Sequence, residues 1–360
     1  MQHTSINEPF ETVAGWRSRD VADPKLWTYQ ITSEEKDEIE TAFKIVRNLD
    51  KSFHDLTTSD FPLPRFGKRL RELTDALESG LGFTVIKGLP IVDKTEDEAR
   101  LISWGIGLYI GIGLPQNDSG TLIHDVRDRG ETSQKTLRGN GSSEEIQFHI
   151  DPCDIVGLFC RRAAAKGGGS KLCSSVEICQ RIAAEEPRLF EQLRSIVPFA
   201  ALGASEDSVR VYYVPVFGWH KGAFTSHYYR ARIIKASSLP SVSLSDEQRA
   251  AVDLVQTMAS DPEMHMEMQL EPGDLQLVNN HIVYHSRTAY EDHEDFDRRR
   301  HLFRFWFSVP GSRELPAEFA NVWGKTTAGS VRGGVRLWDG KFDVVDRYQE
   351  RMAGLHNMSL

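Results

Sequence analysis

The chain has 360 residues, of which 40% are hydrophobic and 26% charged, a composition that excludes a disordered or low-complexity protein. Its formal net charge of -9 disfavours a nucleic acid or an anionic membrane surface as a partner. No stretch approaches the roughly 20 apolar residues that span a bilayer, and residues 1–4 lack the basic-then-apolar start of a signal peptide. We therefore expect a cytoplasmic protein.

Residues 1–110 are predicted to be mostly helical and to pack on the rest of the chain. A capping box at 32–35 starts one helix, and apolar side chains follow it at helical spacing, at Ile39, Ala42, Phe43 and Val46. A second helix ends near Gly80 and carries three leucines on one face, Leu70, Leu73 and Leu77. A third helical stretch is expected near 95–110.

Residues 111–315 are predicted to form a β core with helical insertions, and residues 316–360 a C-terminal extension of the same single domain. Short strands are expected at 121–127, 145–151, 155–160, 264–271, 275–279 and 300–309. Helices are expected near 176–195 and 246–259, the second with a capping box at 245–248. Many short strands with peripheral helices predict a mainly β fold, a barrel or jelly roll, rather than a parallel α/β sheet.

The four cysteines form no C-x-x-C pair and are expected to be reduced thiols, at Cys153, Cys160, Cys173 and Cys179. A zinc site made from them is the alternative interpretation, but their spacings match neither a zinc finger nor a zinc knuckle.

A candidate metal site begins in the strand that ends in Phe148-His149-Ile150-Asp151-Pro152. Alternate residues of a strand point to one face, so His149 and Asp151 can aim at the same point. Pro152 cannot donate to a sheet ladder, and we expect the strand to end there. A histidine and an aspartate at this spacing are frequent by chance, so the interpretation needs a third ligand.

His285 is the best candidate for that ligand, since it follows a turn at 271–274 and a strand at 275–278. Two histidines and one carboxylate on one face of an octahedral ion leave half of the positions open, as in non-haem Fe(II) oxygenases. The open positions suit a bidentate 2-oxo acid and O2. His281 lies four residues before His285, a spacing that suits zinc on a helix, but no H-E-x-x-H is present and we place His281 in a loop or behind the ligands.

The strand at 300–307 carries two arginines on one face, Arg300 and Arg304, which they share with Leu302 and Trp306. Unpaired charges on so apolar a strand are costly, so both cations need anionic partners. The distal carboxylate of 2-oxoglutarate is one such partner and an acidic side chain of the chain itself is the other. Fe(II) with one carboxylate ligand has a net charge of +1. The dianionic cosubstrate brings this net charge to -1, and one arginine then neutralises it.

Taken together, the chain resembles the taurine-dioxygenase-like, or clavaminate-synthase-like, Fe(II)/2-oxoglutarate oxygenases from about residue 60 to 315. The matching stretches are 148–160, 167–175, 272–274, 279–280, 285–288 and 300–306. The resemblance implies a double-stranded β-helix (jelly roll) core, and His149, Asp151 and His285 as the iron ligands. Related halogenases replace the metal carboxylate by a small residue, so the presence of Asp151 implies oxygenation rather than halogenation.

The resemblance also assigns cosubstrate residues. Arg300, fifteen residues after His285, is similar to the arginine that binds the distal carboxylate of 2-oxoglutarate, and Ser170 to a second contact with it. Arg304 resembles a position that faces the substrate in some members and supports the cosubstrate in others. Gln147 shares the strand face of His149 and is a second candidate for binding substrate.

The implied function is a dioxygenase that uses Fe(II), 2-oxoglutarate and O2 to hydroxylate, desaturate or cyclise a small polar metabolite or amino acid derivative, in secondary metabolism. A taurine- or sulfonate-type catabolic dioxygenase is the second hypothesis. A non-catalytic jelly-roll binding module and a zinc hydrolase are alternatives of other classes. We expect a small-molecule substrate and neither a nucleic acid nor a membrane as partner, and the sequence leaves homo-oligomers open.

Overall fold

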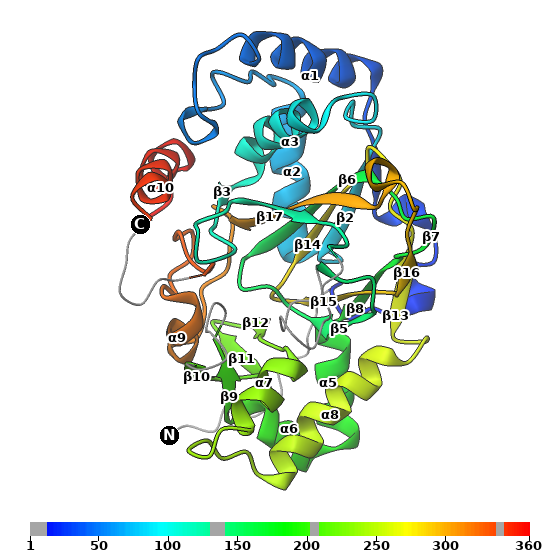
Figure 1. Ribbon diagram of the computed structural model, residues 1–360. Helices are drawn as coiled ribbons and strands as arrows, with labels where there is room; N and C mark the ends of the chain where they lie inside the picture. The colour runs from blue at the N-terminus through cyan, green and yellow to red at the C-terminus, as the bar shows by residue number, and fades with distance from the viewer. Residues whose placement is uncertain (1–12, 130–140, 202–208, 336–341) are drawn as a thin grey trace.

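Two β-sheets face each other in the computed structural model, which describes residues 13–129, 141–201, 209–335 and 342–360 (Figure 1). The larger sheet has the order β1-β2-β14-β6-β17-β3, with β4 also paired to β17. Its strands are β1 (Thr28–Gln30), β2 (Phe83–Lys87), β3 (Ile112–Gly113), β4 (Ile123–Val126), β6 (Ile155–Arg162), β14 (Leu275–Asn279) and β17 (His301–Ser308). The smaller sheet, β13-β8-β15-β5, consists of β5 (Ile146–His149), β8 (Ser170–Ser174), β13 (His265–Met268) and β15 (Val283–Arg287).

Helices α1 (Ser33–Val46), α2 (Phe66–Ser79) and α3 (Glu96–Ile110) cover the outer face of the larger sheet, as Figure 1 shows. Their apolar faces share one core with the outward side chains of β17, Phe303, Phe305 and Phe307. Helix α10 (Asp343–His356) joins this core through Tyr348, whose ring lies 5.3 Å from that of Trp104. The predicted capping box of α1 is confirmed, because the Thr32 and Glu35 side chains each accept a hydrogen bond from the other's backbone N–H.

Helices α5 (Ser175–Glu185), α6 (Pro187–Arg194), α7 (Arg230–Ser237) and α8 (Asp246–Ser260) lie at the opposite end of the molecule, below the smaller sheet in Figure 1. The single helix expected at 176–195 is two helices. Pro187 has no N–H for the preceding turn and drives Glu186 out of the helical region, to φ -135° and ψ 61°.

Short elements complete the fold. They are the hairpins of β9 (Ile196–Ala200) with β10 (Val211–Pro215) and β11 (Phe217–His220) with β12 (Ala223–Ser226), the pair of β7 (Lys166–Gly167) with β16 (Tyr290–Glu291), helix α9 (Ala320–Trp323), and 3₁₀ turns at Ser18–Val21, Pro24–Leu26, Phe53–Asp55, Phe296–Arg298 and Ala317–Phe319. The sequence analysis did not predict the two hairpins.

The mainly β jelly-roll class with peripheral helices is confirmed. The division at residues 110 and 315 stays a prediction; β1 and β2, from the first of those parts, are strands of the larger sheet. The four cysteines are free and buried, as expected. Within the described part of the chain, no helix has the length and apolarity to cross a membrane.

A buried ionic network at the ends of β6, β14 and β17 ties four distant segments together. Its centre is Asp154, whose Oδ1 accepts hydrogen bonds from Arg332 Nε and His281 Nε2, both at 2.9 Å. Its Oδ2 accepts from Ser308 Oγ and Val309 N, both at 3.1 Å. Burial raises the pKa of Asp154, but the Arg332 cation and the His281 hydrogen bond outweigh it and hold the pKa at about 2. His281 therefore supports the fold and lies outside the group of metal-ligand candidates.

We expect Asp154→Ala to reduce the free energy of unfolding by about 3–5 kcal/mol, because it leaves the fully buried Arg332 guanidinium without its anion. Urea unfolding followed by circular dichroism measures the loss. The control is Glu291→Ala, which breaks the exposed Lys166–Glu291 pair and should cost less than about 1 kcal/mol. Similar losses in the two variants would contradict a stabilising role for the network.

Candidate active site

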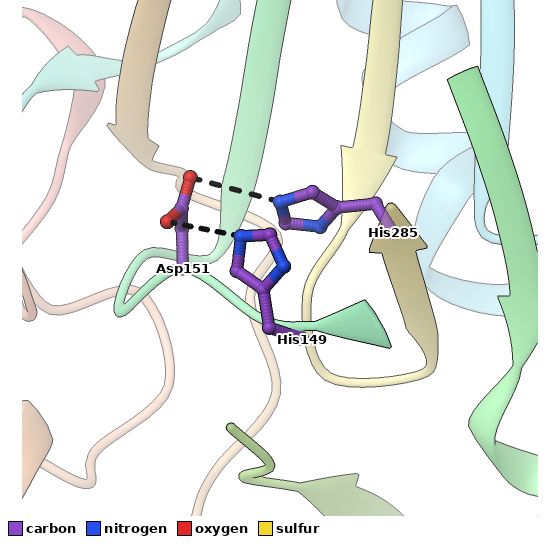
Figure 2. A group of neighbouring side chains, drawn as sticks. All are labelled: His149, Asp151 and His285. Carbon is purple, nitrogen blue, oxygen red and sulfur yellow. Dashed lines mark ion pairs between the residues drawn. The ribbon is translucent and has the colours of Figure 1, made fainter. Parts of the chain in front are cut away.

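The two histidines of the candidate metal site lie opposite each other in the smaller sheet. His149 is the last residue of β5, and it pairs directly with His285 in the middle of β15. Their ring centroids are 4.3 Å apart. Asp151 lies beyond the strand, in a turn fixed by a hydrogen bond from Ile150 N to the Tyr228 carbonyl at 2.9 Å. The prediction that the strand reaches Asp151 is wrong, yet the three side chains point toward one another (Figure 2).

The geometry of these three side chains suits one metal ion. Asp151 Oδ1 lies 4.0 Å from His149 Nε2, and Asp151 Oδ2 lies 3.8 Å from His285 Nε2. Two atoms that each bind one ion at about 2.1 Å are at most about 4.2 Å apart, so the distance between Asp151 Oδ1 and His149 Nε2 fits a shared ion. All three residues are buried, and their ligand atoms lie within 4.8 Å of one another.

The protonation states also suit a divalent cation. His149 Nδ1 lies 2.8 Å from the Gln147 carbonyl, an acceptor only, so Nδ1 carries the proton and Nε2 keeps its lone pair. Burial lowers the pKa of both histidines, that of His285 to about 3, and both are neutral at neutral pH. Burial raises the pKa of Asp151, but the Arg304 cation and the two imidazoles hold it at about 2. The site therefore offers two neutral imidazoles and one carboxylate.

One oxygen of Asp151 is held by the larger sheet. Trp306 Nε1 on β17 donates to Asp151 Oδ2 at 2.7 Å, and Arg304 Nη1 lies 3.4 Å from the same oxygen. Arg304 is itself anchored by a hydrogen bond from its Nε to Gln116 Oε1 at 2.8 Å. The indole contact was not predicted, although the sequence analysis placed Trp306 and Arg304 on the correct face. The other oxygen, Asp151 Oδ1, lies on the side of His149.

A small cavity of about 60 Å³ adjoins the two histidines and is cationic. Arg300 and Arg287 both line it, and each has buried guanidinium nitrogen atoms with no hydrogen-bond partner in the described parts of the chain. Among the described residues, no carboxylate lies within 4.0 Å of either guanidinium. Ser170 also lines this cavity, and its hydroxyl donates to Gln276 Oε1 at 2.9 Å. Burial lowers the pKa of both arginines, that of Arg287 to about 10, so both remain cations that require an anion.

A larger cavity of about 610 Å³ adjoins Asp151 on its other side. Its polar lining includes Tyr212, His227, Arg232 and Asn321. Tyr229 also lines it, and its ring centroid lies 4.7 Å from that of His149. A cavity of this size holds a small metabolite. The Gln147 side chain is exposed and belongs to the lining of neither cavity.

A second group of metal-ligand types, Glu96, Asp125 and His301, is an ion-pair cluster. Arg100 Nη2 lies 2.7 Å from Asp125 Oδ1, and Arg127 Nη1 lies 3.7 Å from Glu96 Oε2. These cations already neutralise the carboxylates, so the cluster is a poor site for a metal.

Residues 46–306 match the family described as "Taurine catabolism dioxygenase TauD, TfdA family". The chain belongs to the TauD, TfdA family. It is 29% identical over 330 residues to FR-33289 synthase of Streptomyces rubellomurinus. The aligned region covers 90% of this chain and 97% of the synthase.

Solved structures of two non-haem iron oxygenases share the fold. Asparagine oxygenase, in complex with Fe(II), 3-hydroxyasparagine and succinate, superposes with a TM-score of 0.60 at 17% identity. The match covers 81% of this chain and 98% of the asparagine oxygenase chain. OrfP, in complex with Fe, succinate and (3S)-hydroxy-L-Arg, superposes with a TM-score of 0.59 at 16% identity. The match covers 78% of this chain and 94% of the OrfP chain.

This TauD-family protein is thus an enzyme, an Fe(II)- and 2-oxoglutarate-dependent dioxygenase with O2 as the oxidant. The family resemblance expected from the sequence is confirmed. The donor set of two imidazoles and a carboxylate fits Fe(II), and the unpaired guanidinium N–H groups of the small cavity fit a dicarboxylate.

Trp306→Phe should weaken Fe(II) binding by about 10- to 100-fold, because it removes the donor that orients the Asp151 carboxylate and keeps most of the ring volume. Anaerobic titration of the metal-free protein with Fe(II) measures the change. The control, Trp27→Phe, removes an indole N–H that donates to the Val21 carbonyl outside the site, and it should leave iron affinity unaltered. Equal affinities in all three proteins would refute the orienting role.

Proposed function

We propose that His149, Asp151 and His285 hold the Fe(II) of this dioxygenase, and that Arg300 binds the distal carboxylate of 2-oxoglutarate with Ser170 as a second contact. The observation that carries the proposal is the convergence of three neutral or anionic ligand atoms between two cavities, of which the smaller is cationic.

Bound iron, with 2-oxoglutarate and O2, supplies the oxidant that attacks an unactivated C–H bond, and the protein determines which hydrogen lies close to it. The Gln147 carbonyl holds the His149 ring in the tautomer that leaves Nε2 free. Trp306 and Arg304 occupy one oxygen of Asp151 and leave the other for the metal. The chain thus positions all three ligands before the metal binds.

We propose a small polar metabolite or amino acid derivative as substrate, with hydroxylation as the first expected outcome. The solved structures of asparagine oxygenase and OrfP contain hydroxylated amino acids, which supports this class. Desaturation or cyclisation would use the same ligands. The name of the Streptomyces relative, a synthase, supports a biosynthetic role over taurine- or sulfonate-type catabolism.

We further propose that the enzyme works in the cytoplasm on a free small molecule, without a nucleic acid or membrane partner. The four free, buried cysteines and the net charge of -9 support this setting. Arg304, which lines the small cavity, stays a candidate for a contact with cosubstrate or substrate, whereas the exposed position of Gln147 speaks against the substrate contact considered for it.

Replacing His149, Asp151 or His285 by Ala should abolish both iron binding and substrate-dependent release of succinate, because two remaining ligands cannot hold the ion at its open face. Iron content is measured after gel filtration, and succinate by a coupled assay with L-asparagine, L-arginine, taurine and related metabolites. His220→Ala is the matched control, since His220 pairs with Glu314 outside the site. Full iron occupancy together with full turnover in any of the three variants would refute the ligand assignment.

Arg300→Met should raise the dissociation constant of 2-oxoglutarate by about 10- to 150-fold, since a hydrogen bond to a charged group contributes about 1.5–3 kcal/mol. The weaker 2-oxobutyrate, which lacks the distal carboxylate, should bind both proteins equally. Anaerobic titration of the Fe(II) protein, followed by the visible charge-transfer band of the chelate, measures both acids.

Arg287→Met provides the internal comparison, because Arg287 lines the same cavity. If this variant loses the preference for 2-oxoglutarate and Arg300→Met keeps it, the anchor is Arg287 and the assignment of Arg300 is wrong.

A further inference from the structure

The larger cavity contains a buried cation for which the described residues supply no counter-ion. Arg232, in the first turn of α7, is 7% exposed and lines this cavity. Its Nη1 donates to the Ala200 carbonyl over a long 3.4 Å, and its guanidinium carbon lies 5.0 Å from the centre of the Tyr229 ring. In the residues that the structure describes, no carboxylate lies within 4.0 Å of the guanidinium, whereas the neighbouring Arg230 pairs with Asp253 at 2.6 Å.

This arrangement is costly for a protein that binds no anion there. A guanidinium removed from water requires a counter-charge and partners for its N–H groups. A cation–π contact, a long hydrogen bond to the Ala200 carbonyl and a hydrogen bond to the Tyr212 hydroxyl supply partners but no negative charge, so they satisfy these requirements only in part. The planar fork of an arginine is suited to the two oxygens of a carboxylate or another oxyanion.

A neutral pair of side chains beside Arg232 offers further hydrogen bonds. Tyr212 Oη and His227 Nε2 lie 2.9 Å apart, and both residues line the cavity. His227 Nδ1 is buried and finds no hydrogen-bond partner among the residues with a described structure. Burial lowers the pKa of His227 to about 3 and raises that of Tyr212 to about 12, so neither carries a charge at neutral pH. An anion at Arg232 would therefore meet no competing negative charge from this pair.

The position of Arg232 relates it to the metal group. Arg232 N donates to the Tyr229 carbonyl at 3.0 Å, which closes the first turn of α7. Tyr229 forms a bridge with His149, and their rings lie 4.7 Å apart. The Tyr229 ring thus lies between the buried cation and a proposed iron ligand, and Asp151 lines the same cavity. A molecule bound at Arg232 can extend along this ring toward the metal.

We propose that Arg232 binds an oxyanion of the substrate, and that the substrate is therefore a small acid anchored in the larger cavity beside the Tyr229 ring. This inference rests on the proposed function of the site and names the substrate class. Arg304, the cation that the sequence analysis considered for this role, already contacts Asp151 and Gln116 and lines the small cavity instead.

The test uses the whole protein loaded anaerobically with Fe(II) and saturating 2-oxoglutarate, so that the small cavity is filled. Acetate, inorganic phosphate and methanesulfonate serve as probes, and their binding is measured from the saturable rise in the thermal unfolding midpoint. We expect millimolar binding of at least one anion, weakened about tenfold or more by Arg232→Met. The anion that binds most tightly identifies the acid group as carboxylate, phosphoryl or sulfonate.

Arg230→Met is the matched control, since it removes the neighbouring guanidinium of the same helix and should keep anion binding. Arg232→Lys should restore part of the affinity through its charge. The visible band of the iron–2-oxoglutarate chelate is recorded for every variant. If Arg232→Met does not fold, Arg232→Gln, which keeps a donor for the Ala200 carbonyl, is expected to show the same loss.

Absence of saturable anion binding in the unaltered protein, or equal binding in the Arg232 and Arg230 variants, would overturn the proposal while the chelate band persists. Absence of the band from the unaltered protein would instead contradict the iron and 2-oxoglutarate assignment.

Discussion

The pairing of β5 with β15 is the constraint on which the site depends. It sets His149 opposite His285 across one ladder, with ring centroids 4.3 Å apart, before any metal is bound. The third ligand candidate, Asp151, comes from outside this ladder and is held by Trp306 from the facing sheet. A shift of either strand by one residue would turn one imidazole to the opposite face of the sheet. The geometry of the candidate metal site therefore depends on the register of these two strands.

The three candidate ligands are surrounded by buried arginines whose positive charges destabilise the protein when no anion is bound. Arg300 and Arg287 line the small cavity beside the ligand candidates His149 and His285, and Arg232 lines the larger cavity together with Asp151. Each cation is poorly compensated by the described residues, so each bound anion offsets part of their mutual repulsion. Cosubstrate and substrate should therefore stabilise the folded protein beyond the effect of their direct contacts.

The candidate ligands could be selected from the sequence because they lie in short motifs, but the residues that support them could not. The alternation along 300–307 predicted the face shared by Arg304 and Trp306, yet nothing in it shows that the indole reaches Asp151. The helix that carries Arg232 and the hairpins before it were not predicted, because short strands rich in aromatic residues are not distinguished from loops or core by periodicity. The larger cavity is formed by these segments, so its chemistry required the structure.

Two separate cationic anchors give the site a way to sort two acids of similar charge. The small cavity, at about 60 Å³, is much smaller than the larger one, which at about 610 Å³ admits a bulkier molecule. Arg304 lines the small cavity with its guanidinium engaged by Asp151 and Gln116, so it is not free to rotate into the larger cavity. Selectivity for the second acid then depends on the distance between Arg232 and the metal, because only a substrate of matching length brings a C–H bond to the iron while its oxyanion is bound.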